Sequence, residues 1–215
     1  MLGLLKKITE LQIRNARYAN PLTLLPGNVP IFEYLDQLIQ DRQVFTVAYC
    51  DIDNFKPYND VYGYGEGDKV IKLIAEILRS NVHPSIDFIG HVGGDDFIVV
   101  FSGDNWMERC RSILHDFEHQ IPDLYSDEDI LRGGILSHSR EGDERFFPIM
   151  TLSIGAVIPN TIDHTRRRSQ HGQSGEASCQ SHQRQQLVHR AQGQFLTLRS
   201  NLRQLPLQMF FSISC

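Results

Sequence analysis

Two acidic stretches supply the residues of this sequence that are best suited to chemistry. The first is Asp51-Ile52-Asp53, which directly follows an apolar run, and the second is Asp95-Asp96, which follows the pair Gly93-Gly94. Neighbouring carboxylates repel one another unless a cation lies between them, and Mg²⁺ binds hard oxygen ligands of this kind. Either stretch alone would be ordinary for a solvated turn. Together they suggest a shared divalent-metal site.

The second acidic stretch is predicted to lie at the tip of a β-hairpin. Apolar residues are frequent in 86–92 and fill 97–101, on the two sides of Gly93-Gly94. Glycine adopts positive φ without a Cβ clash, so we expect Gly93-Gly94 to take both central positions of a tight turn. Residues 44–50 are rich in β-forming side chains and predict a central strand that ends at Asp51. If this strand lies beside the hairpin, the carboxylates meet.

Apolar residues at helical spacing predict the elements around these strands. One of the predicted helices, at residues 2–19, either packs on the body of the domain or pairs with a second copy of the chain. The other helices are expected at 29–40, from Asp68 onward behind Gly63, Gly65 and Gly67, and at 104–120. The remaining segments are predicted to be a turn-rich connector at 20–28, a turn or helical turn at 54–60, irregular chain at 122–144 with a short strand near 134–136, and a last strand at 147–158.

The charge of the chain is unevenly distributed. The total is −5 over 215 residues, but residues 161–215 hold seven Arg and two acids, so this tail carries +5 and the remainder −10. An acidic body argues against nucleic-acid binding as the main function. The tail is rich in Gln and Ser without hydrophobic periodicity, so it is expected to lack regular structure. We therefore divide the chain into an N-terminal helix or linker at 1–19, a folded domain at 20–160 and an atypical tail at 161–215.

Cysteine spacing and hydropathy argue against other classes of protein. The four cysteines show no paired metal-ligand spacing, and Cys50 lies in an apolar run, so it is expected to be a small buried hydrophobic residue. Lys6, Lys7 and Glu10 interrupt the apolar residues near the start of the sequence. We therefore expect no signal peptide and no membrane span.

Two long, spaced motifs add a resemblance to a known family. Residues 20–158 closely resemble the GGDEF domain of diguanylate cyclases, on the motifs Asp51-x-Asp53-x-Phe55-Lys56-x-x-Asn59-Asp60-x-x-Gly63-x-x-x-Gly67-Asp68 and Gly93-Gly94-Asp95-Asp96-Phe97. The resemblance implies an α+β, palm-like nucleotide-cyclase fold, with a central, mainly antiparallel sheet of about five strands flanked by helices. It also implies the family's reaction, in which two GTP are condensed to cyclic di-GMP in bacterial signalling, with Mg²⁺ or Mn²⁺ as the cofactor.

The same resemblance implies roles for individual residues. Asp51, the backbone carbonyl of Ile52, and Asp95 would be the metal ligands, and Asp95 and Asp96 would be the catalytic acids. Asp96 stands where the family has an acid that deprotonates or orients the attacking 3′-hydroxyl. The residues expected to bind the substrate are Asn59 and Asp68 at the guanine base, Phe55 and Lys56 near the phosphates, and Tyr64, Gly93 and Gly94 beside the nucleotide.

The partners follow from the proposed reaction. Each chain of the family holds one GTP and the product needs two, so catalysis implies a homodimer, for which the predicted helix at 2–19 is a candidate pairing element. The expected location is cytoplasmic. One alternative is a degenerate module that binds GTP without turnover and regulates a partner, such as a cyclic di-GMP phosphodiesterase or a sensor domain. A second alternative is a scaffold with an empty site.

Several positions depart from the family pattern. Asp96 replaces the usual Glu, Tyr64 replaces a frequent His, and His91 replaces a frequent Arg. The basic helix that follows the last strand in the family has no counterpart in residues 161–215. The feedback site of the family is an Arg-x-x-Asp, but this chain has Pro84-Ser85-Ile86-Asp87, so we expect no cyclic di-GMP binding there. The changes at Asp96, Tyr64 and His91 and the missing basic helix predict weak turnover.

Overall fold

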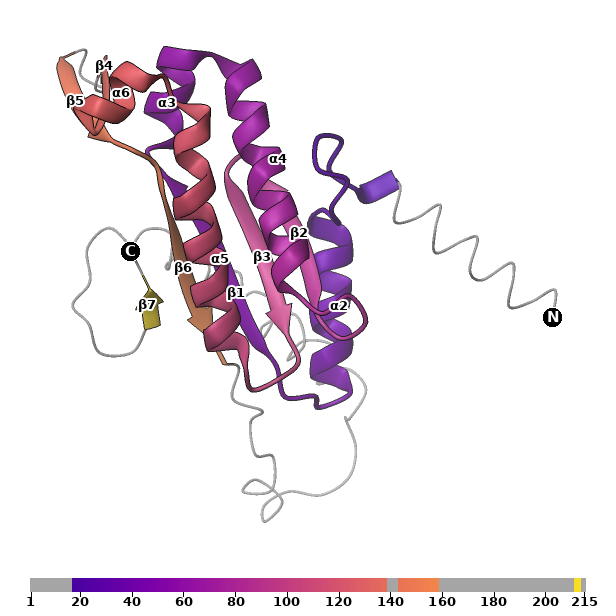
Figure 1. The fold of residues 1–215 in the computed structure, drawn as a ribbon. Helices are drawn as coiled ribbons and strands as arrows, with labels where there is room; N and C mark the ends of the chain where they lie inside the picture. The colour runs from indigo at the N-terminus through magenta and orange to yellow at the C-terminus, as the bar shows by residue number, and fades with distance from the viewer. Residues whose placement is uncertain (1–16, 139–142, 159–210, 214–215) are drawn as a thin grey trace, which may run out of the picture.

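The computed structural model describes residues 17–138, 143–158 and 211–213 (Figure 1). The predicted helix at 2–19 and most of the predicted unstructured tail lie outside the described residues. The helices and strands that surround the acidic stretches are α2 (Asn28–Gln40), β1 (Thr46–Asp53), α3 (Phe55–Tyr62), α4 (Tyr64–Asn81), β2 (Phe88–Gly93), β3 (Asp96–Phe101) and α5 (Trp106–Gln120). They are followed by the 3₁₀ helix η1 (Ile121–Leu124), α6 (Asp127–Arg132), β4 (Gly134–His138), β5 (Glu144–Pro148), β6 (Thr151–Val157) and β7 (Phe211–Ile213).

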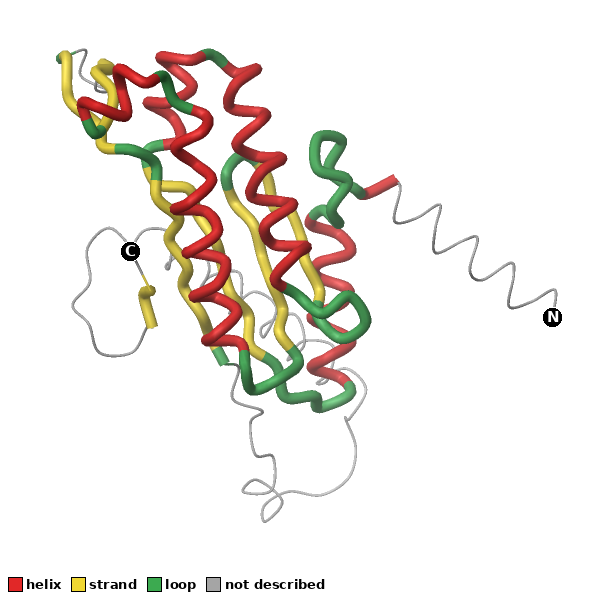
Figure 2. The backbone as a smooth tube through the Cα atoms, viewed as in Figure 1, coloured by secondary structure: helices red, strands yellow, loops and turns green. Residues whose placement is uncertain are grey.

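The main sheet has five strands in the order β2-β3-β1-β6-β7. Every neighbouring pair in it is antiparallel, and β7 is a three-residue strand from the tail that pairs with β6. A second sheet is formed by β4 and β5, which lie beside α6 at one end of the molecule (Figures 1 and 2). The expected α+β class with a mainly antiparallel central sheet is confirmed.

The sheet separates two hydrophobic clusters because successive strand residues point to opposite faces. Cys50 on β1 and Phe97 on β3 belong to the larger cluster, which lies under α4 and α5 (Figure 1). Tyr49 and Ile98 belong to the smaller cluster, which packs against α2. Cys50 is 0% exposed, so its expected role as a small buried hydrophobic residue is confirmed.

Helix α3 is a full helix of eight residues where a turn or a single helical turn was predicted. Pro57 did not prevent it, because the third residue of a helix needs no backbone N–H donor. Helix α4 begins at Tyr64, four residues before the predicted start, since Gly65 and Gly67 are accommodated within its first turns.

The segment 122–144 was predicted to be irregular apart from a short strand near 134–136. That strand is present as β4, but the prediction is wrong for the preceding residues, which form η1 and α6. Helix α6 begins after Ser126, whose side chain accepts a hydrogen bond from the Asp129 backbone N–H, and it ends at Gly133, which has φ 78°. Three acids in its first turn complement the helix dipole. The predicted last strand at 147–158 is divided into β5 and β6, which belong to different sheets.

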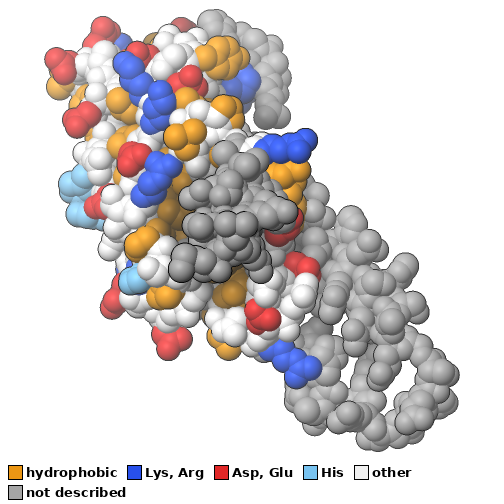
Figure 3. Space-filling view, turned by 90° about the vertical axis from the view of Figure 1, so that its right-hand side faces the viewer, with side chains coloured by type: hydrophobic (Ala, Val, Ile, Leu, Met, Phe, Trp, Pro, Cys, Tyr) orange, Lys and Arg blue, Asp and Glu red, His pale blue; other side chains and the backbone are white. Residues whose placement is uncertain are grey.

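The surface of the described residues shows no gathering of one charge on the face drawn in Figure 3. Basic and acidic side chains are interspersed there with apolar ones. Among the described helices, none combines the length and the apolar character that crossing a bilayer would require.

Candidate metal and nucleotide site

The structure brings three carboxylates together at one end of the sheet. Asp51 on β1 lies directly opposite Asp96 on β3 in the strand register, and Asp95 precedes Asp96 in the chain. One oxygen of each of these three side chains lies within 4.8 Å of the others. Successive strand residues point to opposite faces of the sheet. Asp51 and Asp96 each lie two residues from a side chain that packs against α2, Tyr49 and Ile98 respectively, so both acids are on the α2 face. Two segments distant in the sequence thus form one acidic cluster.

The turn that carries Asp95 differs by one residue from the prediction. Gly93 is the last residue of β2 and pairs with Asp96, so the two central turn residues are Gly94 and Asp95 rather than Gly93-Gly94. The register shift between His91 and Gly93 accounts for the difference, because a bulge uses one extra residue on β2. Both glycines still have positive φ, 149° at Gly93 and 60° at Gly94. The extra residue moves Asp95 into the turn itself.

The acidic cluster strongly affects the ionisation of Asp51. Burial and the nearby negative charge of Asp95 raise the pKa of Asp51 from 3.8 to about 7, and a hydrogen bond between the Asp51 and Asp96 side chains contributes. Asp96 is only 5% exposed. Burial disfavours the ionised form of Asp51, and the neighbouring carboxylates add to this effect, so a divalent cation would replace the retained proton.

The side chains of two residues that follow Asp51 in β1 are not part of the cluster. The Asp53 carboxylate accepts hydrogen bonds from Thr151 Oγ1 at 3.0 Å and Ser153 Oγ at 2.5 Å, so it ties β1 to β6. The side chain of Ile52 is 2% exposed and belongs to the core under α4 and α5. Only the backbone carbonyl of Ile52, and not its side chain, is expected to contribute to the site.

The predicted guanine-binding residues lie where α3 meets α4. The Oδ1 atom of Asn59 is buried and has no hydrogen-bond partner among the described residues. It lies so close to Gly67 that a Cβ atom there would be 1.8 Å away. Asp68, the next residue of α4, is exposed. A buried polar atom without a partner is uncommon, and a polar ligand that reached it would satisfy it.

The remaining predicted substrate residues are placed less centrally. Phe55 is partly buried and packs against the core under α4 and α5. The ammonium group of Lys56 lies 2.6 Å from the Asp60 carboxylate on the surface of α3. Tyr64 is 80% exposed at the start of α4. Within the described residues, therefore, only Lys56 of these three offers a positive charge.

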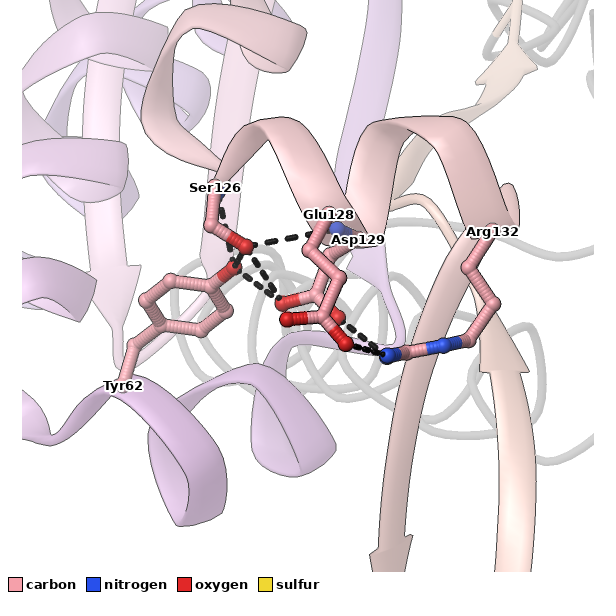
Figure 4. A network of polar contacts seen from close by, with 5 residues as sticks. All are labelled: Tyr62, Ser126, Glu128, Asp129 and Arg132. Carbon is pink, nitrogen blue, oxygen red and sulfur yellow. Dashed lines mark hydrogen bonds and ion pairs between the residues drawn. The ribbon is translucent and has the colours of Figure 1, made fainter.

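Helix α3 is held in place by tyrosines that the sequence analysis did not single out. Tyr58 is fully buried, donates a hydrogen bond to the Leu124 carbonyl at 2.7 Å and stacks on Tyr62 with ring centroids 4.6 Å apart. The Tyr62 hydroxyl accepts from the Ser126 backbone N–H at 2.9 Å and donates to the Asp129 carboxylate at 2.5 Å (Figure 4). This hydrogen bond lowers the pKa of Asp129.

The same network extends along α6. Arg132 forms ion pairs with both Asp129 and Glu128, each at 2.5 Å (Figure 4). Its members come from α3 on one side and from the segment 126–132 on the other. The network therefore holds one face of α3 against η1 and α6.

A shallow groove of about 360 Å³ lies elsewhere, between α5 and the start of β6. Its lining includes Leu114, Phe117 and Met150, and it contains none of the predicted site residues. The acidic cluster, rather than this groove, is thus the candidate site.

Comparison with protein families matches residues 18–145 to the family described as "Diguanylate cyclase, GGDEF domain". Among curated proteins, the diguanylate cyclase DgcP of Pseudomonas aeruginosa is 35% identical over 111 residues, which are 47% of this chain and 16% of that protein. The diguanylate cyclase DgcP of Escherichia coli is 30% identical over 150 residues, which are 68% of this chain and 40% of that protein. The matched region thus spans less than half the length of either relative.

Solved structures share the fold. Diguanylate cyclase SiaD of Pseudomonas aeruginosa, solved with its activator SiaC, has a TM-score of 0.53 and 19% identity over 87% of this chain and 62% of that one. The coiled coil and GGDEF domain of DgcB from Caulobacter crescentus, solved with c-di-GMP, has a TM-score of 0.50 and 20% identity over 74% of this chain and 78% of that one.

Proposed function

Because the chain belongs to the GGDEF family of diguanylate cyclases, we propose that it binds GTP with Mg²⁺ or Mn²⁺ and that two copies condense two GTP to cyclic di-GMP. The observation that carries the proposal is the meeting of Asp51, Asp95 and Asp96 within 4.8 Å. These acids come from the two motifs on which the family resemblance depends. In such a reaction, the 3′-hydroxyl oxygen of one GTP attacks the α-phosphorus of the other, and pyrophosphate leaves.

The residues of the cluster suit a divalent cation. Asp51, Asp95 and the carbonyl of Ile52 would hold the ion, since these are hard oxygen ligands, and burial together with the nearby charge of Asp95 raises the pKa of Asp51. The bound ion would neutralise charge on the triphosphate. Asp96 lies opposite Asp51 in the strand register, and its carboxylate would act as the base that orients the attacking hydroxyl and accepts its proton.

Guanine would bind at Asn59 and Asp68. The Asp68 carboxylate can accept hydrogen bonds from the base N1–H and the exocyclic amine, and the Asn59 amide can bind the other polar atoms of the base. Adenine would leave these groups unpaired, and unpaired polar groups are the main source of discrimination against a wrong base. Phe55, Lys56, Tyr64 and the glycines Gly93 and Gly94 would border the phosphates and sugar.

Two glycines of α4 allow a direct test of the base site. The change Gly67→Ala would push the Asn59 side chain aside, because the new Cβ would lie 1.8 Å from Oδ1, whereas a Cβ at Gly65 meets nothing within 4 Å. We expect Gly67→Ala to weaken GTP binding about tenfold or more, and Gly65→Ala to leave it unchanged. Isothermal titration calorimetry with GTP and Mg²⁺ measures both. Equal affinities in the two variants would contradict the proposed base site.

The metal and the reaction are tested with a second pair of variants. The change Asp95→Asn should abolish Mg²⁺-dependent GTP binding, whereas Asp123→Asn removes one exposed charge on η1 and should not. Chromatography of GTP incubated with Mg²⁺ or Mn²⁺ reveals cyclic di-GMP. GTP binding without product at high protein concentration would instead assign the chain the role of a regulatory GTP-binding module. Equal GTP binding by the wild type and Asp95→Asn would remove the metal assignment.

The proposed reaction also determines the oligomeric state, the location and the partner that we expect. Two chains must face each other, since each holds one GTP, so activity should rise with protein concentration. The predicted helix at 2–19 remains the candidate pairing element. We propose a cytoplasmic location, where GTP is available, and a partner signalling domain such as a sensor or a cyclic di-GMP phosphodiesterase.

A further inference from the structure

A buried histidine lies directly behind the acidic turn. His91 on β2 is 3% exposed and stacks on Phe97, with ring centroids 4.2 Å apart. Its Nε2 atom lies 3.0 Å from the carbonyl oxygen of Gly94, a central residue of the turn. Its Nδ1 atom lies 3.0 Å from Thr23 Oγ1, which is 68 residues away in the sequence. The ring thus bridges the turn and the segment that enters the domain.

The chemistry of the partners gives these hydrogen bonds a direction. A carbonyl oxygen only accepts, so the Nε2 atom of His91 must carry the hydrogen. In the neutral ring, Nδ1 then accepts, and the Thr23 hydroxyl must donate to it. Burial lowers the pKa of His91, which agrees with a neutral ring. The Leu25 backbone N–H donates to Thr23 Oγ1 at 3.4 Å, so the hydroxyl is oriented from its other side.

Further hydrogen bonds hold the segment that contains Thr23 in position. Asn20 Oδ1 accepts from the backbone N–H of Leu22 at 2.9 Å and of Thr23 at 3.3 Å. The Arg79 guanidinium of α4 donates to the Thr23 carbonyl. The His91 backbone N–H donates to the Pro26 carbonyl at 2.8 Å. A displacement of residues 20–26 would therefore move the Thr23 hydroxyl relative to the His91 ring.

We infer that His91 is a positioning residue, and that the chain of hydrogen bonds Thr23–His91–Gly94 sets the geometry of the acidic turn according to the placement of residues 20–26. The carbonyl of Gly94 belongs to the peptide bond that leads directly to Asp95. Turning this peptide would redirect the Asp95 side chain by rotation about the neighbouring backbone bonds. The importance of this geometry for catalysis rests on the proposed function, whereas the coupling itself does not.

Two substitutions at Thr23 test the inference. The change Thr23→Val keeps the size of this 4% exposed side chain and removes the donor, whereas Thr23→Ser keeps the donor. In Thr23→Val, we expect the His91 ring nitrogen shifts and the amide shifts of Gly94 and Asp95 to change, as observed by NMR without ligand. Mg²⁺ affinity, titrated on the same amides, should fall about three- to tenfold, and at saturating Mg²⁺ kcat should fall with little change in the KM for GTP. Thr23→Ser should restore all of these values.

A further variant covers the case in which Thr23→Val does not fold. His91→Phe keeps an aromatic ring on Phe97 and removes both ring nitrogens, and it should shift the same two amides and weaken Mg²⁺ binding. Unchanged Gly94 and Asp95 amides in the folded variants, or equal effects of Val and Ser at position 23, would overturn the inference. If the wild type forms no cyclic di-GMP, the proposed function fails, but the ring and amide shifts still decide whether the coupling exists.

Discussion

Replacing Asp51 by Asn should stabilise the metal-free protein and remove a ligand of the proposed metal site. The pKa of Asp51 is raised from 3.8 in the unfolded chain to about 7 in the folded one. The unfolded state therefore loses this proton first as the pH rises, and folding stability falls between about pH 4 and pH 7 and is constant above. Asn carries no charge, so the variant does not lose folding stability as the pH rises. Asp51→Asn should therefore be more stable than the wild type only toward the upper end of this pH range and above it.

The size of the effect follows from the shift. A rise from 3.8 to about 7 corresponds to about 4 kcal/mol at most. Asp51 is only partly buried, and solvent screening reduces the figure to about 2 kcal/mol. The side-chain amide introduced by the substitution would also donate to the neighbouring carboxylates. We therefore expect Asp51→Asn to raise the free energy of unfolding by about 2 kcal/mol near pH 8 and to change it little near pH 4.

Urea unfolding in EDTA at both pH values measures this difference. Asp123→Asn is the matched control, because it removes one exposed charge outside the cluster. Addition of Mg²⁺ should stabilise the wild type and not Asp51→Asn, since a ligand stabilises only the state that binds it. If Asp51→Asn were less stable than the wild type by the same amount at both pH values, Asp51 would be making a favourable contact unrelated to its charge, and the reasoning would be refuted.

Four further outcomes are expected. Because Mg²⁺ must displace a proton from Asp51, its affinity should rise about tenfold per pH unit below about pH 7 and level off above, and a flat profile in calorimetry would contradict the raised pKa. The change Tyr62→Phe removes the hydroxyl shared with Ser126 and Asp129, so it should cost about 1 kcal/mol in urea unfolding and speed hydrogen exchange in 126–132 more than in α5. The change Arg109→Met leaves the buried carboxylate of Asp87 with one partner fewer, so unfolding should become easier by about 3 kcal/mol. The wild type should show no calorimetric binding of cyclic di-GMP at Asp87, whose carboxylate is already bound by Arg109 and the Ser102 backbone N–H.

The strands around the acids could be predicted because their apolar residues are dense and their limits are sharp. The run that ends at Asp51 and the paired runs around Gly93-Gly94 correspond to β1, β2 and β3. The exact turn could not be predicted, because a bulge between His91 and Gly93 has no signature in the residue pattern. Its effect was to exchange one glycine for Asp95 at the centre of the turn.

Helix α6 shows a different reason for failure. Its start and stop signals, Ser126 and Gly133, are present in the sequence, but none of its residues is buried, so hydrophobic periodicity gave no indication of it. The bridge from Thr23 to His91 has no local signal at all, because its partners are 68 residues apart and meet only in the folded sheet. A pattern method finds elements that bury their own faces and misses polar contacts between elements.

The acidic site depends on apolar neighbours for its existence. Asp51 and Asp96 share a sheet face because β1 and β3 pair in a single register, and a slip of one residue would send one of the carboxylates to the face under α4 and α5. That register is specified by Cys50 and Phe97, which alternate with the acids and are both 0% exposed. Burial of such side chains contributes a few kcal/mol each to folding. The core therefore keeps together carboxylates that would otherwise separate, and the retained proton of Asp51, or the cation that we propose in its place, would relieve their repulsion.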